Sequence, residues 1–395
     1  MDNIWSDNKY INFCINCLLF LMGVNFLHYG QLMLPVICFL LFIDNKLKFK
    51  VNNPITFVVL CLFSVSFYAF TNKQLGFYSV MGFCMPMAYY IGSNMKHPEE
   101  NNIKKIIYLF AVSMCIHIIL NSIFEYIVHG KRGFFTSTTH YDFWTKEKIS
   151  NTSTAINIDI MLGCLYYLLF HEKNKRLRTL NIIIFCISMF YLIVIGRRTP
   201  VVMIFIAFVL AYFYETMILK DFSKRLKKRF LSLLTLVIGV VGVLVLMYVF
   251  NAFNCREVFN DFRIVQKFTK NFINDQRFEL YFGSFALMPK YLWGGQHISK
   301  ILGEQVHDFW IDIYDCAGII TCGIMLYYSY IYVRDMARMY KSKEISNDFK
   351  VFMVGINTCI ILQMFLEPVM TGASLFLITA IIIHGLFERL TLNEQ

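Results

Sequence analysis

A histidine and three carboxyls between positions 307 and 315 are the groups of this chain best placed for chemistry. Asp308, Asp312 and Asp315 stand at i, i+4 and i+7, so a helix brings them onto one face. They open a long apolar run, and ionisable residues inside a membrane span are costly and indicate function by default. The helix dipole explains an acid at Asp308 but not the two deeper acids. This face either lines a polar cavity or pairs with basic groups that hold helices together.

Several arginines could bind an anionic group. Arg197 and Arg198 occupy a tight turn between two apolar runs, and Pro200 suits the first turn of the helix that follows. Guanidinium groups stay charged and bind phosphate oxygens in pairs, so this turn could clamp an anion at the membrane surface. Alternatively, both side chains reach lipid headgroups. Arg132 and Arg277 are further candidates in other segments.

The composition indicates which elements position these groups. Of 395 residues 57% are hydrophobic and 16% are charged, and the mean hydropathy is +0.54. These values exclude a soluble enzyme, a disordered protein and a secreted disulfide scaffold. We predict an all-α polytopic membrane protein with about twelve transmembrane helices in a single domain, 1–395, and read the first run as a retained helix. The apolar runs are 10–28, 29–43, 54–70, 75–92, 104–128, 153–170, 179–196, 201–219, 231–250, 308–333, 351–368 and 372–388.

The net charge of +11 gives an orientation. Twelve spans put both termini on one side, and assigning that side to the cytoplasm places 23 of the 37 Lys and Arg residues inside, as the positive-inside rule requires. Of the 14 outer cations, 13 fall in the segments 129–152, 197–198 and 251–307. We therefore predict cytoplasmic termini, a smaller extracytoplasmic loop at 129–152 and a large late one at 251–307. The large loop is too apolar to be disordered, and we expect short amphipathic helices in it.

Several kinds of chemistry lack a sequence motif. The histidines form no HExxH or HxH pattern, and no Walker A, GxGxxG or GxSxG motif occurs. Most of the 12 cysteines lie inside apolar runs, where they act as small apolar residues. We therefore expect no metal, no cofactor, no disulfide framework and no nucleic-acid partner.

A longer pattern runs through positions 190–320. It begins with an arginine, a proline and two adjacent glycines, and continues with a histidine, a polar residue, a hydrophobic residue, an acid and a last glycine. In this order the residues are Arg277, Pro289, Gly294, Gly295, His307, Asp308, Ile311, Asp312 and Gly318. This pattern resembles the core signature of the O-antigen ligase and polymerase superfamily. The turn at Gly196 and the two following arginines resembles that family's Gly/Ser-Arg turn. Asp308 stands where the family usually has Asn, and Cys316 where it often has an acid.

The resemblance implies an enzyme acting on glycans carried by undecaprenyl diphosphate at the outer face of the bacterial inner (plasma) membrane. Because that donor is already activated, neither nucleotide nor metal is needed, and the enzyme must bind a diphosphate and deprotonate a sugar hydroxyl. The implied catalytic residues are His307 as base with Arg277 and Arg198 at the diphosphate. The implied substrate-binding residues are Arg197, Arg132, Asp308, Asp312, Tyr281 and Trp310. Aromatic residues at the membrane interface would also explain Tyr281 and Trp310.

Four functions are considered for these residues. A polymerase of O-antigen or capsule repeat units is favoured over a ligase that passes the glycan to a lipid A core, although the signature belongs to both. A flippase or transporter of the lipid-linked unit predicts two similarly interrupted halves, which the sequence lacks. A non-catalytic scaffold of an export complex does not explain the clustered outer cations. Membrane lipid, a chain-length regulator and a flippase of the same pathway are the expected partners.

Overall fold

The computed structural model describes residues 4–137, 139–220, 276–305 and 307–392, with isolated positions between 228 and 251. The described part is helical apart from one two-stranded antiparallel hairpin, β1 (His140–Tyr141) with β2 (Lys148–Ile149). Eight described helices are long and apolar enough to cross a membrane, and two shorter apolar helices precede them. The chain is therefore an all-α polytopic membrane protein. The count of twelve spans stays a prediction.

The chain forms two compact units, and two helices run from one into the other. The first comprises Met1–His117, Gln276–Ser346 and Ile360–Gln395, and the second Ile118–Asp275 and Asn347–Cys359. Helices α5 (Glu100–Thr136) and α16 (Asn347–Leu366) belong partly to each. The predicted single domain thus contains two packing units.

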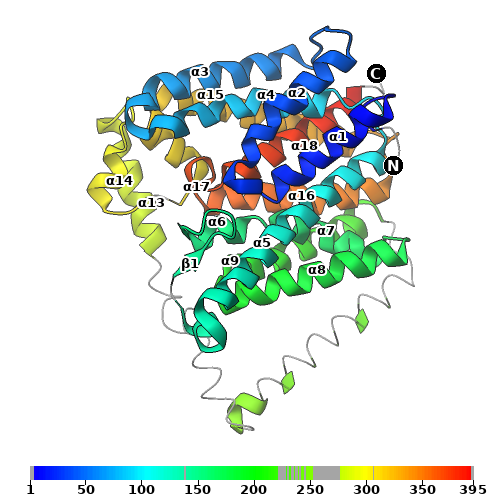
Figure 1. Ribbon diagram of the computed structural model, residues 1–395, viewed down its shortest axis with the longest axis vertical. Helices are drawn as coiled ribbons and strands as arrows, with labels where there is room; N and C mark the ends of the chain where they lie inside the picture. Colours follow the sequence, from blue (N-terminus) through cyan, green and yellow to red (C-terminus); the bar gives the residue numbers. More distant parts are fainter. Residues whose placement is uncertain are drawn as a thin grey trace. The chain divides into compact units, whose positions relative to one another are not determined.

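The amino-terminal part of the first unit contains four helices before α5 (Figure 1). Their bounds are Lys9–Gly23 for α1, Met33–Asp44 for α2, Pro54–Leu75 for α3 and Cys84–Ser93 for α4. Asparagines begin two of them: Asn8 accepts from the N–H of Tyr10 at α1, and Asn53 accepts from two N–H groups at α3. Short 3₁₀ turns are Phe26–His28, Gly30–Leu32 and Gly76–Phe83, so the predicted run 75–92 is a 3₁₀ segment followed by a short α-helix.

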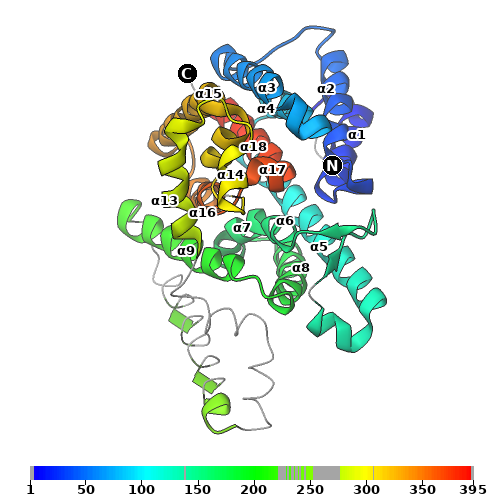
Figure 2. The same cartoon turned by 90° about the vertical axis from the view of Figure 1, so that its left-hand side faces the viewer.

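The carboxy-terminal part of the first unit contains the remaining helices. Their bounds are Gln276–Leu287 for α13, His297–Leu302 for α14, Phe309–Lys341 for α15, Val369–Gly372 for α17 and Ser374–Leu392 for α18. Helix α17 is a short turn that lies against α15 and α18 (Figure 2). Helices α13 and α14 are short helices inside the predicted loop 251–307, whereas residues 252–275 of that loop lie outside the described residues.

Glycines let α4 and α18 approach closely at the centre of the first unit. A Cβ on Gly92 would lie 2.3 Å from the carbonyl oxygen of Ile382, and one on Gly385 would lie 2.9 Å from that of Tyr89. Small residues at such crossings are typical of membrane helices, whose association depends on close van der Waals packing. Helix α18 is consequently the most enclosed span of this unit, with 83% of its apolar window buried.

The described residues of the second unit form four further helices and the hairpin, besides parts of α5 and α16. Their bounds are Asn151–Ile156 for α6, Asp159–Phe170 for α7, Lys175–Val194 for α8 and Thr199–Phe213 for α9, with a π-helical turn at Tyr214–Ile218. Helices α7 and α16 cross at a pair of glycines, because a Cβ on Gly355 would lie 2.1 Å from the carbonyl oxygen of Gly163. The hairpin and the end of α5 fill most of the predicted loop 129–152.

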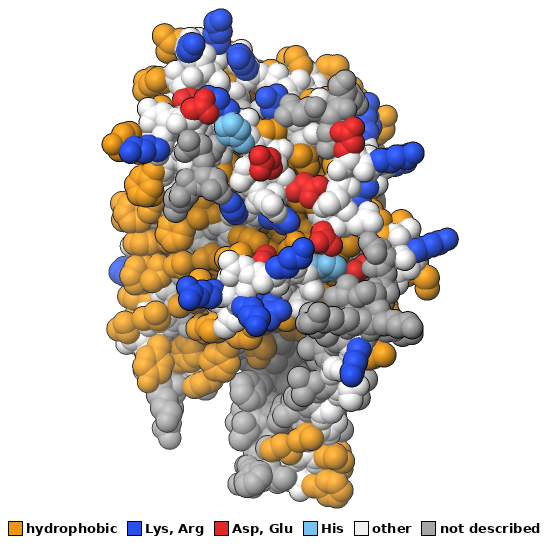
Figure 3. Space-filling model, turned by 90° about the vertical axis from the view of Figure 1, so that its right-hand side faces the viewer, with side chains coloured by type: hydrophobic (Ala, Val, Ile, Leu, Met, Phe, Trp, Pro, Cys, Tyr) orange, Lys and Arg blue, Asp and Glu red, His pale blue; other side chains and the backbone are white. Residues whose placement is uncertain are grey.

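Both ends of the described chain lie on one side of the first unit (Figure 1). The carbonyl of Ile4 accepts hydrogen bonds from the N–H groups of Lys96 and His97. At the end of α18, Arg389 donates to Asn52 at 2.8 Å. Figure 3 shows this side, on which Lys, Arg, Asp, Glu and His side chains gather. Cations of this kind follow the positive-inside rule; the cytoplasmic assignment itself stays a prediction.

Candidate functional site

The centre of the candidate site is a hydrogen bond between His307 and Glu367. Nδ1 of His307 lies 3.0 Å from Oε2 of Glu367, although 60 residues separate the two in the chain. Glu367 is the first residue after α16, and Pro368 prevents that helix from continuing. His307 precedes α15, so the two helix ends meet here.

The carboxylate determines the state of the imidazole. An ionised carboxylate only accepts hydrogen bonds, so opposite an ionised Glu367 the neutral ring donates from Nδ1 and its Nε2 is the acceptor. Nε2 of His307 has no hydrogen-bond partner in the described part of the chain. The His307 side chain is 30% exposed whereas that of Glu367 is 2% exposed. A partly exposed histidine is therefore held by a buried carboxyl group.

Tyr281 holds the backbone of this site. Its hydroxyl lies 2.7 Å from the carbonyl oxygen of Phe365 and also contacts the carbonyl oxygen of His307. The tyrosine thus joins α13 to the end of α16 and to the start of α15. The sequence predicted a sugar-stacking ring at Tyr281, and the structure adds an anchoring role for its hydroxyl.

Asp308 begins α15. Its backbone is extended, and its Oδ1 accepts from the N–H groups of Trp310 and Ile311, each at 2.9 Å. Burial raises the pKa of the Asp308 carboxyl, although these two backbone hydrogen bonds oppose the change. Helix capping, the simpler explanation of Asp308 in the sequence, therefore accounts for its contacts.

Asp312 connects α15 to the segment that carries Glu367. Its carboxylate accepts from the N–H of Thr371 at 3.2 Å and from the Thr371 hydroxyl at 2.9 Å. It also accepts from the side-chain amide of Gln305 at 3.0 Å. Because Thr371 follows Glu367 by one turn, Asp312 fixes where Glu367 stands relative to α15. Asp312 is a positioning residue, one step away from His307.

Asp315 holds the first turn of α14 and the residue before it. Its two carboxylate oxygens accept from the N–H groups of Ile298 at 2.8 Å and Ser299 at 3.1 Å. Its carbonyl accepts from the N–H of Gln296 at 2.8 Å. Asp308, Asp312 and Asp315 are thus bound by neutral donors, and none of these three forms an ion pair with a described cation.

The glycines of the sequence pattern meet around a break in α15. Gly318 has φ +78° and ψ −177°, a conformation essentially restricted to glycine. The N–H of Ile319 donates to the carbonyl of Leu292 at 2.9 Å, and a Cβ on Gly318 would lie 2.6 Å from that oxygen. A Cβ on Gly294 would lie 2.7 Å from the carbonyl oxygen of Cys316. Both glycines therefore seat the loop before α14 against α15.

The remaining predicted residues are distributed differently. Trp310 packs in the bundle: its indole N–H donates to Ser329 at 3.1 Å and its ring lies 4.7 Å from that of Phe365. Arg197 and Arg198 are half-buried in the second unit, at the turn before α9. The side chains of Arg132 and Arg277 lie outside the described residues, although their backbones are helical.

Glu367, Thr371 and Gln305 were not expected from the sequence. The sequence contained one indication of a special role for Glu367: it is an acid directly before a proline at the end of an apolar run. No protein-family model matches this chain, and no curated protein sequence matches it. The relation to the O-antigen ligase and polymerase superfamily therefore remains a resemblance.

Proposed function

We propose that this chain is a polysaccharide polymerase of the plasma membrane. It would transfer an undecaprenyl-diphosphate-linked glycan of the O-antigen or capsule type onto another lipid-linked repeat unit, at a site facing the periplasm or cell exterior. The observation that carries the proposal is the contact between Nδ1 of His307, whose side chain is 30% exposed, and the buried Glu367. His307, Asp308 and Asp312 of the sequence pattern lie at the same end of α15 as this contact.

In the proposed reaction, the acceptor hydroxyl attacks the anomeric carbon of the donor glycan. The bond between that carbon and the diphosphate oxygen breaks, and its electron pair stays on the diphosphate. The hydroxyl proton passes to Nε2 of His307, and Glu367 stabilises the imidazolium that forms. Arg197, Arg198 and Arg277 are the residues expected to stabilise the diphosphate charge. A ligase would use the same steps with a lipid A core as acceptor.

The test is glycan transfer by the purified full-length protein in liposomes with undecaprenyl-diphosphate glycan and no nucleotide. We expect His307→Ala to slow chain growth by about 10²–10⁴-fold, the usual contribution of a general base. Glu367→Gln should also slow it, because the imidazolium loses its counter-charge. His297→Ala is the matched control, since His297 is an exposed histidine of α14 that stacks on Tyr291.

The outcomes separate the alternatives. Wild-type rates in the His307→Ala protein would refute the proposed base. Growth on a lipid A core but not on lipid-linked repeat units would indicate a ligase. Movement of the lipid-linked glycan across the bilayer without any new glycosidic bond would indicate a flippase.

A further inference from the structure

A second group of ionisable residues joins α15 to α18. Asp335 of α15 and His384 and Glu388 of α18 each offer one ligand atom, and these atoms lie within 4.8 Å of one another. His384 and Glu388 are four residues apart and therefore share a helix face. All three side chains are buried, with exposed fractions of 2%, 0% and 3%. Buried charges are retained in proteins when they are paired or bind a metal.

Two atoms of this cluster have no hydrogen-bond partner. They are Oδ2 of Asp335 and Nε2 of His384, and they face each other at 3.5 Å. Two ligands of a tetrahedral zinc ion lie about 3.4 Å apart, because each bond is about 2.1 Å long. These two atoms, which form no hydrogen bond, therefore have the separation of two ligands of one ion.

Further hydrogen bonds orient the three ligands. Nδ1 of His384 lies 3.1 Å from the Tyr328 hydroxyl, which fixes the ring and leaves Nε2 directed at Asp335. The other oxygen of Asp335 accepts from Arg334 at 2.9 Å and from Arg338 at 3.3 Å. The guanidinium groups therefore occupy Oδ1 and not Oδ2. Metal ligands are typically held in this way by outer hydrogen bonds.

Glu388 is held separately. Its Oε1 accepts from the side-chain amide of Asn53 at 2.9 Å, and its Oε2 contacts the Tyr89 hydroxyl. Each carboxylate oxygen has two acceptor positions, so either can also bind a cation. Asn53 is the residue that begins α3, which brings a third helix to the cluster.

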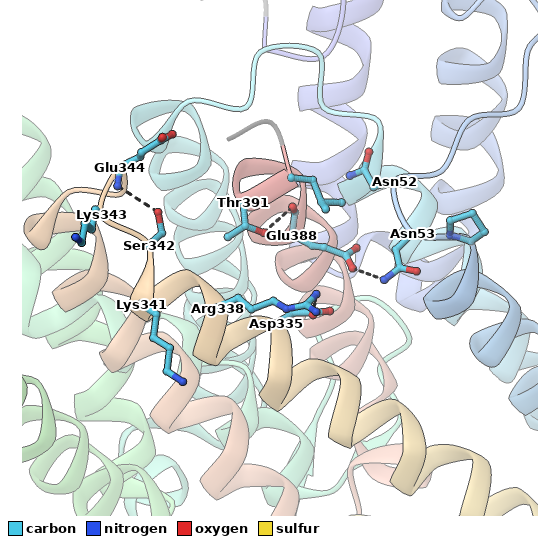
Figure 4. Close-up of a pocket in the computed structure, with 12 residues that line it drawn as sticks. Asn52, Asn53, Asp335, Arg338, Lys341, Ser342, Lys343, Glu344, Glu388 and Thr391 are labelled. Atoms are coloured by element: carbon cyan, nitrogen blue, oxygen red, sulfur yellow. Dashed lines mark hydrogen bonds and ion pairs between the residues drawn. The ribbon is translucent and has the colours of Figure 1, made fainter. Parts of the chain in front are cut away.

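A cavity of about 490 Å³ gives access to the cluster. Asp335 and Glu388 line it together with Arg338, Lys341 and Asn53 (Figure 4). An ion bound by three protein ligands has room there for a water as a fourth ligand, the arrangement found in open zinc sites.

We propose that Asp335, His384 and Glu388 bind a divalent transition metal of the zinc class. The ligands would be Oδ2 of Asp335, Nε2 of His384 and one carboxylate oxygen of Glu388, and the ion would join the ends of α15 and α18. The site is independent of the proposed glycan transfer. Asp312 lies before the break at Gly318, and Asp335 lies 17 residues beyond that break, about 25 Å along a helix.

The direct test uses the full-length protein in detergent with the metal alone. After treatment with a chelator, titration with Co²⁺ should give the visible absorption of a tetrahedral site. This absorption should saturate at about one Co²⁺ ion per chain. Zn²⁺ should displace Co²⁺ and raise the thermal unfolding midpoint. If no absorption develops and neither ion changes the midpoint, His384 and Asp335 form only a buried ion pair and the proposal is wrong.

Two isosteric variants locate the site. Glu388→Gln removes a ligand charge, and Tyr328→Phe removes only the hydroxyl beside Nδ1 of His384. We expect Tyr328→Phe to weaken Co²⁺ affinity by about 10–100-fold, the usual effect of losing an outer hydrogen bond. Tyr327→Phe and Glu344→Gln are the matched controls, because Tyr327 is exposed and Glu344 lines the cavity outside the cluster. Equal affinities in Tyr328→Phe and Tyr327→Phe proteins would place the metal elsewhere.

Discussion

Replacement of Gly318 by alanine tests how the loop before α14 is held against α15. The backbone of Gly318 has φ +78° and ψ −177°, which costs a residue with a Cβ about 1–3 kcal/mol. The added Cβ would also lie 2.6 Å from the Leu292 carbonyl oxygen. An overlap with fixed backbone adds about 1–3 kcal/mol, so Gly318→Ala should destabilise this region by about 2–6 kcal/mol in total.

Gly323 on the same helix is a matched control. A Cβ at Gly323 would meet no atom within 4 Å, and alanine forms helix more readily than glycine by up to about 1 kcal/mol. Gly323→Ala should therefore leave the unfolding midpoint unchanged or raise it, while Gly318→Ala lowers it.

A local measurement distinguishes loop displacement from general unfolding. The Cys316 side chain is 2% exposed, and its carbonyl accepts from the N–H of Gly295 at 3.3 Å. We expect Gly318→Ala to speed maleimide labelling of Cys316, followed by peptide mass spectrometry, whereas labelling of buried Cys359 on α16 stays slow. If Gly318→Ala matches Gly323→Ala in both midpoint and labelling, the glycine break does not hold the loop.

Two further predictions concern other contacts. Asp312→Asn places an amide against the Thr371 donors, so we expect a loss of about 1–3 kcal/mol in the free energy of unfolding and slower glycan transfer; wild-type values of both would contradict the positioning role. His171 lies 3.2 Å from Glu215 and 3.2 Å from Asp348, and although burial opposes the charged ring, these carboxylates raise its pKa from 6.5 to about 9. This charged pairing stabilises the protein by up to roughly 3 kcal/mol below pH 6.5 and is lost as the pH rises through about 9. The difference in unfolding midpoint between wild type and His171→Asn should shrink over that range, and a constant difference would exclude the effect.

Local patterns in the sequence predicted the helical class and the acids of α15. The i, i+4, i+7 spacing of Asp308, Asp312 and Asp315 follows directly from helix geometry, and the structure has all three on α15 or at its start. Apolar runs such as 54–70 and 351–368 became helices because their length and composition suit a membrane. The predicted run 75–92 is not one α-helix, since its first part, which contains Gly76 and Gly82, is a 3₁₀ segment.

Contacts between distant segments could not be predicted in this way. The periodicity of apolar residues does not predict which residue Glu367 contacts, because its partner, His307, is 60 residues away in the chain. The same holds for Asp335 and His384, which come from different helices. The sequence contained the pair His384 and Glu388 at i and i+4, a spacing that brings two ligands together. Without the third ligand that pair had no metal-binding pattern.

The contrast between the two ends of α15 indicates what distinguishes a structural acid from a binding one. At its start, the Asp312 carboxylate receives donors from Thr371 and Gln305, and both Asp315 oxygens receive backbone N–H groups. These acids have satisfied acceptors and need no ligand to offset their burial. At its end, one oxygen of Asp335 and one nitrogen of His384 remain without hydrogen bonds in a buried site. The two atoms lie 3.5 Å apart as an ion pair without a hydrogen bond, and a buried acceptor without a hydrogen bond costs about 1–3 kcal/mol, so a cation bound between them would recover free energy.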